Sequence, residues 1–293
     1  MAVHKIALVG LLLAFAAPVF AAEPGMPGVV NYVEGQAALE GRPLSAQNVG
    51  EAAMRPGEVL TTGQGRVEVL LTPGVFLRMD DNSAVKMISP TLTMTQVELE
   101  QGRVSVEVDE IHKENDLEVV VNGATTQLVK TGFYEFNTTP GQALVFNGMA
   151  AVEVNEGKYT EVKSHRTFDL QVAGNAALLA KEKPQSFNEN MAKDDFYKWN
   201  SLRSQYLAEA NNQMAGQVNG GPGWYWNPYA LSYTYIGVDP FWSPFGWGYY
   251  PFGWSGWYGP AYGYHRGYYG GSGMSGFHGG GFQGGGFHGG GRR

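Results

Sequence analysis

The fold of this chain is decided by two stretches, GRVEVLL at residues 65–71 and LEQGRVSVEV at residues 99–108. In both, aliphatic and polar residues alternate, and this two-residue period is typical of a β-strand with one buried face and one wet face. The alternation continues outward through residues 28–172, which we expect to form an all-β domain. The residues expected on its buried faces are Val67, Val69, Leu71, Leu77, Met79, Val85, Met87, Val97, Leu99, Val104, Val106 and Val108.

Turn signals separate these runs at short intervals. They are Pro56-Gly57, Gly63 to Gly65, Pro73-Gly74, Asp81-Asn82, Asn122-Gly123, Pro140-Gly141, Asn147-Gly148 and Glu156-Gly157. Asn122-Gly123 and Asn147-Gly148 predict two-residue β-hairpin loops, because both central positions of the favoured turn need positive φ. Many short strands joined by tight turns predict a β-sandwich or a short β-roll.

The first 21 residues indicate export. Lys5 precedes an apolar run over residues 6–20, and Val19-Phe20-Ala21 is a small-residue cleavage pattern, so we expect a signal peptide cleaved after Ala21. An uncleaved anchor is the alternative, although the run is shorter than the roughly 20 residues of a membrane helix and contains Pro18. No later stretch is long and apolar enough to span a bilayer. The mature chain is therefore expected in the periplasm, secreted or at the cell surface.

Composition excludes several function classes. The 293 residues contain no cysteine, which rules out disulfides, thiolate metal sites and a thiol nucleophile. The formal net charge is −7 and the cations are scattered along the β region, so nucleic acid is not an expected partner. The domain must therefore be stabilised by an ordinary hydrophobic core.

Residues 173–215 change to a helical period. Apolar residues recur every three or four positions, at Phe196, Trp199, Leu202, Tyr206, Leu207 and Ala210. This spacing predicts an amphipathic helix that begins near Asp194 and Asp195 and ends at Gly216 as a left-handed cap. A shorter helix is expected near residues 175–181. The aromatic stripe should pack onto the β domain or the tail, with partner binding as the alternative.

Residues 216–293 form a low-complexity region rich in aromatic residues and glycine, which ends in repeats of the type GFHGG. We expect it to be at least partly disordered, because glycine-rich chain loses much entropy on folding, although local order is compatible with the aromatic density of residues 223–251. Its rings could fold back on the β domain, adhere to cell-wall glycan or a lipid interface, or self-associate weakly. The candidate binding residues are Trp224, Trp226, Trp242, Trp247, Trp254 and Trp257.

No constellation of catalytic residues is recognisable. The acidic pairs Asp80-Asp81 and Asp194-Asp195 have structural explanations in a turn and at a helix start. The histidines of the β block lie in no nucleophile motif, and the chain has no phosphate-binding loop. His265, His278 and His288 are too few ligands for a closed metal site. The sequence therefore predicts a protein that is not an enzyme and holds neither a metal nor a cofactor.

Four stretches in a fixed order resemble the FecR domain family: PGEVLTTG at residues 56–63, the run at 65–71, DNSAVKM at 81–87 and the run at 99–108. The similarity extends over about residues 28–170. Where family members often have Gly-Thr before a β run, this chain has KTGFYEF at residues 130–136. The segment from Asp195 is similar to one that often follows this domain in exported proteins with Trp/Tyr-rich tails.

The resemblance also bears on function. Regulatory members of the family carry an anti-sigma segment and a transmembrane helix ahead of the periplasmic domain, whereas here we expect only a signal peptide before Gly28. The expected function is a non-enzymatic envelope protein acting as an interaction or scaffolding module, with an envelope protein or cell-wall glycan as partner. The alternatives are glycan binding through the aromatic tail and an accessory role in FecR-type signalling.

Overall fold

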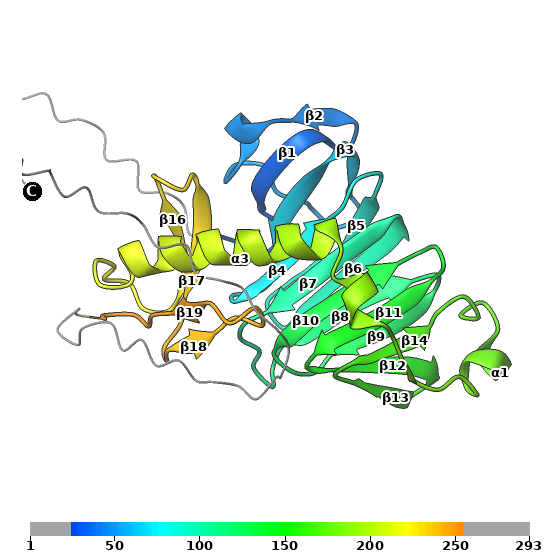
Figure 1. Ribbon diagram of the computed structural model, residues 1–293. Helices are drawn as coiled ribbons and strands as arrows, with labels where there is room; N and C mark the ends of the chain where they lie inside the picture. The colour runs from blue at the N-terminus through cyan, green and yellow to red at the C-terminus, as the bar shows by residue number, and fades with distance from the viewer. Residues whose placement is uncertain (1–24, 255–293) are drawn as a thin grey trace, which may run out of the picture. The chain divides into compact units, whose positions relative to one another are not determined.

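The computed structural model describes residues 25–254 of the chain, and these residues are predominantly β-structure (Figure 1), which confirms the predicted all-β class. The strands of the main sheet are β1 (Val30–Leu39), β2 (Arg42–Leu44), β3 (Val59–Leu70), β4 (Val75–Met79), β5 (Ala84–Pro90), β6 (Met94–Gln101), β7 (Arg103–Val108), β8 (Asp116–Val121), β9 (Ala124–Leu128), β10 (Gly132–Asn137), β11 (Gln142–Asn147), β12 (Met149–Asn155), β13 (Lys158–Lys163), β14 (Arg166–Asp169) and β15 (Gln185–Ser186).

The remaining elements follow or interrupt this sheet. A short 3-10 turn, η1 (Ala46–Asn48), follows β2. The helices are α1 (Ala176–Leu179), α2 (Glu189–Ala192) and α3 (Asp195–Met214), and two hairpins come after them, β16 (Gly223–Asn227) with β17 (Ser232–Ile236) and β18 (Phe241–Trp242) with β19 (Gly248–Tyr249). In the described residues no helix is long and apolar enough to cross a membrane.

Strand β3 is the point at which the sheet divides. One edge of β3 pairs with β1, whereas the other edge pairs first with β5 and then with β4. Two layers leave from here, in the order β5-β6-β8-β9-β12-β13 and β4-β7-β10-β11-β14-β15. Their facing side chains form one apolar core, and this arrangement is the predicted β-sandwich or roll.

The predicted core is confirmed, because all twelve apolar residues expected on buried faces are at most 2% exposed and belong to one cluster. The expectation that every strand has one wet face holds for the layer that contains β6, β8 and β9. It is wrong for β4, β7 and β10, which are buried on both faces. The second face of that layer is buried because the chain covers it with α3 and the aromatic hairpins.

One of the two predicted Asn-Gly hairpins forms and the other does not. Asn122 and Gly123 have φ values of 52° and 86° and join the antiparallel pair β8 and β9. Asn147-Gly148 instead connects strands of different layers, since β11 pairs with β10 and β14, and β12 pairs with β9 and β13. Asn147 is used to accept the backbone N–H of Phe133 at 2.7 Å, which stabilises the crossover.

Helix α3 begins where the sequence predicts it. Asp194 is the N-cap, and its side chain accepts the backbone N–H groups of Phe196 and Tyr197. The predicted left-handed cap at Gly216 is wrong: the C-cap is Ala215 in right-handed conformation, and its carbonyl accepts the N–H of Gly253. A returning segment of chain thus satisfies the helix end in place of a glycine turn.

The aromatic region is folded as far as the structure describes it. Trp224, Tyr233, Tyr235 and Tyr249 join Phe76 and their neighbours in a second apolar cluster between the sheet and α3. The burial of these rings stabilises the hairpins, so low complexity alone does not identify this part of the chain as unfolded. The predicted signal peptide, Trp257, the three tail histidines and the GFHGG repeats lie outside the described residues.

Candidate functional site

The outer face of the β4-β7-β10 layer carries charged residues at strand positions that alternate with the core. Glu68 of β3 lies opposite Arg78 of β4. Glu107 of β7 lies opposite Phe76, which also belongs to β4. The three charged side chains are 0% exposed. Since an unpaired charge in a protein interior is costly, their partners determine what this face can do.

Helix α3 supplies part of that pairing. The guanidinium of Arg78 binds both carboxylates, with its Nε 2.7 Å from Glu68 Oε2 and its Nη1 on Glu107. Arg203 Nη2 lies 2.9 Å from the second oxygen of Glu68, and the Ser204 hydroxyl donates to Glu107 at 2.6 Å. We call these five residues the charged latch, because they fasten α3 to the sheet.

Three fully buried asparagines extend the latch to other elements. Asn200 of α3 accepts the Ser105 hydroxyl at 2.6 Å. The Asn31 amide of β1 donates to Glu68 and to the Tyr233 carbonyl, and its oxygen accepts the Tyr233 N–H at 2.6 Å. Asn211 binds the backbones of residues 235 and 250. The aromatic hairpins are therefore attached to the domain by polar contacts as well as by ring packing.

Electrostatics in the latch favour the ionised state. Burial alone would raise the pKa of Glu68, but the charges of Arg203 and Arg78 outweigh burial and bring it to about 2. Burial likewise disfavours the charged form of Arg78, while Glu107 and Glu68 raise its pKa above the ordinary value. Asp109 differs, because burial and the nearby Glu107 raise its pKa well above 3.8.

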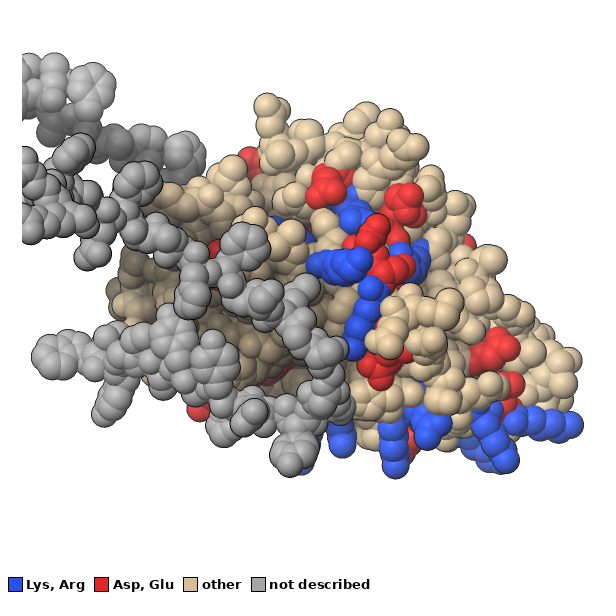
Figure 2. All heavy atoms as spheres, in the orientation of Figure 1, with Lys and Arg blue, Asp and Glu red and all other residues tan. Residues whose placement is uncertain are grey.

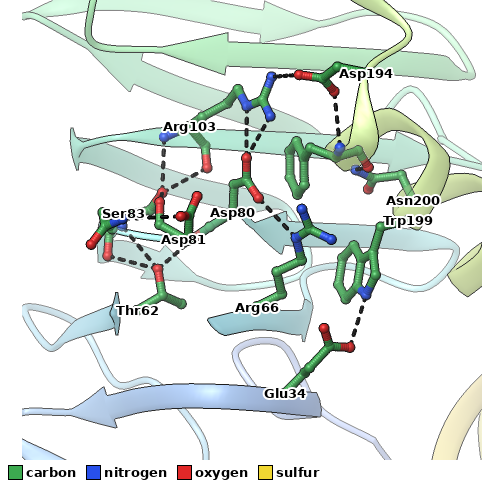
Figure 3. A network of polar contacts seen from close by, with 12 residues as sticks. Glu34, Thr62, Arg66, Asp80, Asp81, Ser83, Arg103, Asp194, Trp199 and Asn200 are labelled. Carbon is green, nitrogen blue, oxygen red and sulfur yellow. Dashed lines mark hydrogen bonds and ion pairs between the residues drawn. The ribbon is translucent and has the colours of Figure 1, made fainter. Parts of the chain in front are cut away.

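A second, partly exposed group of charges surrounds the start of α3 (Figure 3). Asp80 accepts from Arg66 at 2.9 Å and from Arg103 at 2.6 Å, and Arg103 also reaches the helix cap Asp194 at 2.6 Å. The guanidinium of Arg103 lies 4.8 Å from the centre of the Phe196 ring. This group, the cap cluster, ties the first turn of α3 to β3, to β7 and to the residue that follows β4.

The cap cluster includes one carboxyl group with a strongly perturbed pKa. Burial raises the pKa of Glu135 to about 7, although the Arg103 guanidinium, 3.5 Å away, opposes the shift. Glu135 Oε2 has no hydrogen-bond partner among residues 25–254. The pKa of Asp194 is instead lowered, because the hydrogen bond from Arg103 and the helix N–H groups outweigh its partial burial.

The latch has little access to solvent and its carboxylates are engaged by cations and hydroxyls, so its chemistry is structural. Within residues 25–254 no group of three or more His, Asp and Glu side chains is arranged to hold a metal ion. Asp80 and Asp194, from the two acidic pairs singled out in the sequence, also have structural roles. Asp80 forms ion pairs with arginines, and Asp194 caps α3. The arrangement fixes a helix on a sheet.

The tryptophans proposed as a binding platform do not come together on one surface. Trp224 is buried against Phe76 and Tyr235, Trp226 packs edge-on against Tyr233, and the indole of Trp247 donates to the Ser201 carbonyl. Trp254 is half-buried beside Tyr250. Only Trp242, at 61% exposure, presents most of its ring to solvent among the described candidates, and Trp257 lies outside the described residues.

The charged latch was not predicted from the sequence, although the sequence contains a pattern that indicates it. On the sheet the signal is that charged positions in three strands share the face opposite the core. On α3 it is that Asn200, Arg203, Ser204 and Leu207 follow the three- and four-residue spacing of a second helix face. That face is the buried one, whereas Leu202 and Tyr206 of the predicted stripe are exposed.

A family comparison agrees with the resemblance seen in the sequence. Residues 58–159 match the protein family described as FecR protein, so the chain carries a FecR domain. Two solved structures, both described as a candidate anti-sigma factor from Parabacteroides distasonis ATCC 8503, are similar to 44% of this chain at 11% and 10% identity, with TM-scores of 0.35 and 0.36. The chain spans about three fifths of their length, since 58% and 60% of each is covered. None of the curated proteins matches the chain.

Proposed function

We propose that this protein is a non-enzymatic component of the bacterial cell envelope, exported by its signal peptide, whose FecR domain presents α3 as a docking surface for an envelope protein. The supporting observation is that α3 exposes two large apolar side chains, Leu202 and Tyr206, to solvent. The face that it buries against the sheet includes the polar residues Asn200, Arg203 and Ser204 as well as apolar ones.

An apolar strip on α3 joins the exposed Leu202 and Tyr206 to the half-buried Trp199. Trp199, Leu202 and Tyr206 are three and four positions apart and therefore share a helix face, with Leu202 at 48% and Tyr206 at 53% exposure. Trp199 lies beside Tyr32, and the Arg203 guanidinium stacks 4.2 Å from the centre of the Tyr32 ring. Trp, Tyr and Arg are the residues that most often dominate binding energy at protein interfaces.

The surroundings of the strip favour specific docking. Figure 2 shows acidic and basic side chains gathered around the first half of α3, where the cap cluster and the exposed Asp195 and Lys198 lie. An apolar centre with a charged rim is the usual anatomy of a protein interface. Because the latch holds α3 rigidly on the sheet, a partner would not have to order this surface on binding.

A second function, binding of cell-wall glycan, is supported by one observation. Trp242 exposes most of its ring, and a free indole face can stack on the apolar face of a sugar. Under this function Trp242→Ala should abolish co-sedimentation of the protein with cell-wall glycan. Unchanged co-sedimentation of the Trp242→Ala variant would show that Trp242 is not responsible for glycan binding.

Site-specific photo-crosslinking tests the docking function. A photoreactive amino acid at position 206 in the full chain should give discrete higher-mass adducts in intact cells, whereas the same group at the exposed position 100 of β6 should not. When Leu202→Glu is combined with the photoreactive residue at position 206, the adducts should disappear. The melting temperature should not fall, because Leu202 packs only at the surface. Absence of adducts at position 206, or equal adducts at both positions, would contradict the docking function.

A further inference from the structure

A separate polar cavity lies beside β2, away from α3. It has a volume of about 290 Å³ and opens between the β1–β2 hairpin, η1 and the turn that leads into β3. Sites for small molecules usually occupy roughly 300–1,000 Å³, so this cavity has room for a ligand of the size of one sugar unit. Its polar lining includes Arg42, Asn48, Glu51, Arg55 and Glu58.

The two arginines of the cavity have no side-chain hydrogen-bond or ion-pair partner in the described part of the chain. Neither Arg42 nor Arg55 forms an ion pair or a side-chain hydrogen bond with any residue between 25 and 254. This contrasts with Arg66, Arg78, Arg103 and Arg203, each of which binds a carboxylate. A guanidinium presents parallel N–H donors that match a carboxylate or phosphate, so two free guanidiniums in one cavity can bind an oxyanion.

The acidic residues of the cavity restrict the ligand further. Glu51 forms no side-chain hydrogen bond or ion pair in the described residues, and Glu58 uses one oxygen to accept the backbone N–H of Arg55 at 2.9 Å. A bare anion would meet these carboxylates without any hydrogen to offer them. A ligand that also carries hydroxyl groups can donate to Glu51 and Glu58 while its charged group binds the arginines. Leu39 and Pro43 add an apolar wall suited to the C–H face of a sugar ring.

We propose that this cavity binds one unit of an acidic saccharide, through a carboxylate or phosphate held by Arg42 and Arg55 and hydroxyls held by Glu51 and Glu58. The site is independent of the docking strip on α3. It gives this FecR domain a carbohydrate-recognition surface built from the β1–β2 hairpin rather than from the aromatic region.

Isothermal titration of the full chain with glucuronate, glucose 6-phosphate and glucose tests the proposal. At least one of the two acidic sugars should bind, and glucose should bind about tenfold more weakly or worse, because a charged hydrogen bond is lost. The stronger of the two acids identifies the anionic group. Acetate and inorganic phosphate, which lack sugar hydroxyls, should also bind more weakly than the matching acidic sugar.

Substitutions connect the binding to this cavity. Arg42→Gln and Arg55→Gln should each weaken binding of the acidic sugar about tenfold or more, while Arg166→Gln, an exposed arginine of β14, should not change it. Because the side chains of Arg42 and Arg55 form no hydrogen bond or ion pair within residues 25–254, all three variants should melt at the wild-type temperature. The proposal is overturned if neither acidic sugar binds, if glucose binds as well as they do, or if the two cavity variants bind like the wild type.

Discussion

The charged latch predicts a large cost for removing its central cation. In the variant Arg78→Met, Glu107 loses its cationic partner and keeps the Ser204 hydroxyl, and Glu68 keeps Arg203 and Asn31. Both carboxylates are fully buried, so at least one buried charge is left without a counter-ion. Breaking a buried ion pair on one side typically costs about 3–5 kcal/mol. We expect a loss in the upper part of that range, because a single substitution breaks two ion pairs.

Urea unfolding followed by tryptophan fluorescence measures this loss at pH 7. The matched control is Lys163→Met, which removes an ion pair to Glu161 at the surface. The Lys163 side chain is 72% exposed and the Glu161 side chain 58% exposed. A surface pair of this kind should cost no more than about 1 kcal/mol. If Arg78→Met lost as little stability as Lys163→Met, the latch would not stabilise the fold and the reasoning from burial and pairing would be refuted.

Three further predictions concern the elements around the latch. Asp194→Ala should destabilise the protein by about 1–2 kcal/mol in urea unfolding, because the N-cap of α3 is lost, and a loss near zero would contradict that role. Phe133→Ala should cost about 3–5 kcal/mol in the same assay, since the buried Phe133 ring packs against three aromatic side chains. Burial raises the pKa of Glu135 from 4.5 to about 7, so the folded protein binds the proton more tightly than the unfolded chain, and stability falls by up to about 3 kcal/mol as pH rises from 4.5 to 7. Glu135→Gln should remove this fall from the pH profile of unfolding, and parallel wild-type and variant profiles would show that Glu135 is not its source.

Strand positions and the core could be predicted from the sequence because they depend on a local period. Alternation around Val67 and Val106 fixes which side chains are buried, whatever the order of the strands. The Asn147-Gly148 crossover could not be predicted in this way. The same dipeptide forms a hairpin at Asn122-Gly123. The two Asn-Gly sites differ only in whether the strand that follows belongs to the same layer as the strand before, and the dipeptide itself does not determine this.

The latch was harder to predict because it reverses a usual rule. Charged and amide side chains on a helix are normally taken as its solvent face, yet Arg203 and Ser204 are buried through partners about 100 residues or more away, such as Glu68 and Glu107. Long-range pairing of this kind leaves no local pattern. Packing of the aromatic region on the β domain is one of the alternatives from the sequence, but the surface that buries Trp224 and Tyr235 is provided by the sheet and could not be identified from the local sequence.

The central claim is that α3 and the aromatic hairpins complete the FecR domain rather than trailing from it, and hydrogen exchange at β17 tests this claim most directly. All five residues of Ser232–Ile236 are buried and paired with β16. The amides of β17 that pair within the hairpin should exchange as slowly as those of β7 in the centre of the sheet, through unfolding of the whole domain. Exchange of β17 at the rate of an unstructured peptide, while β7 stays protected, would contradict the claim.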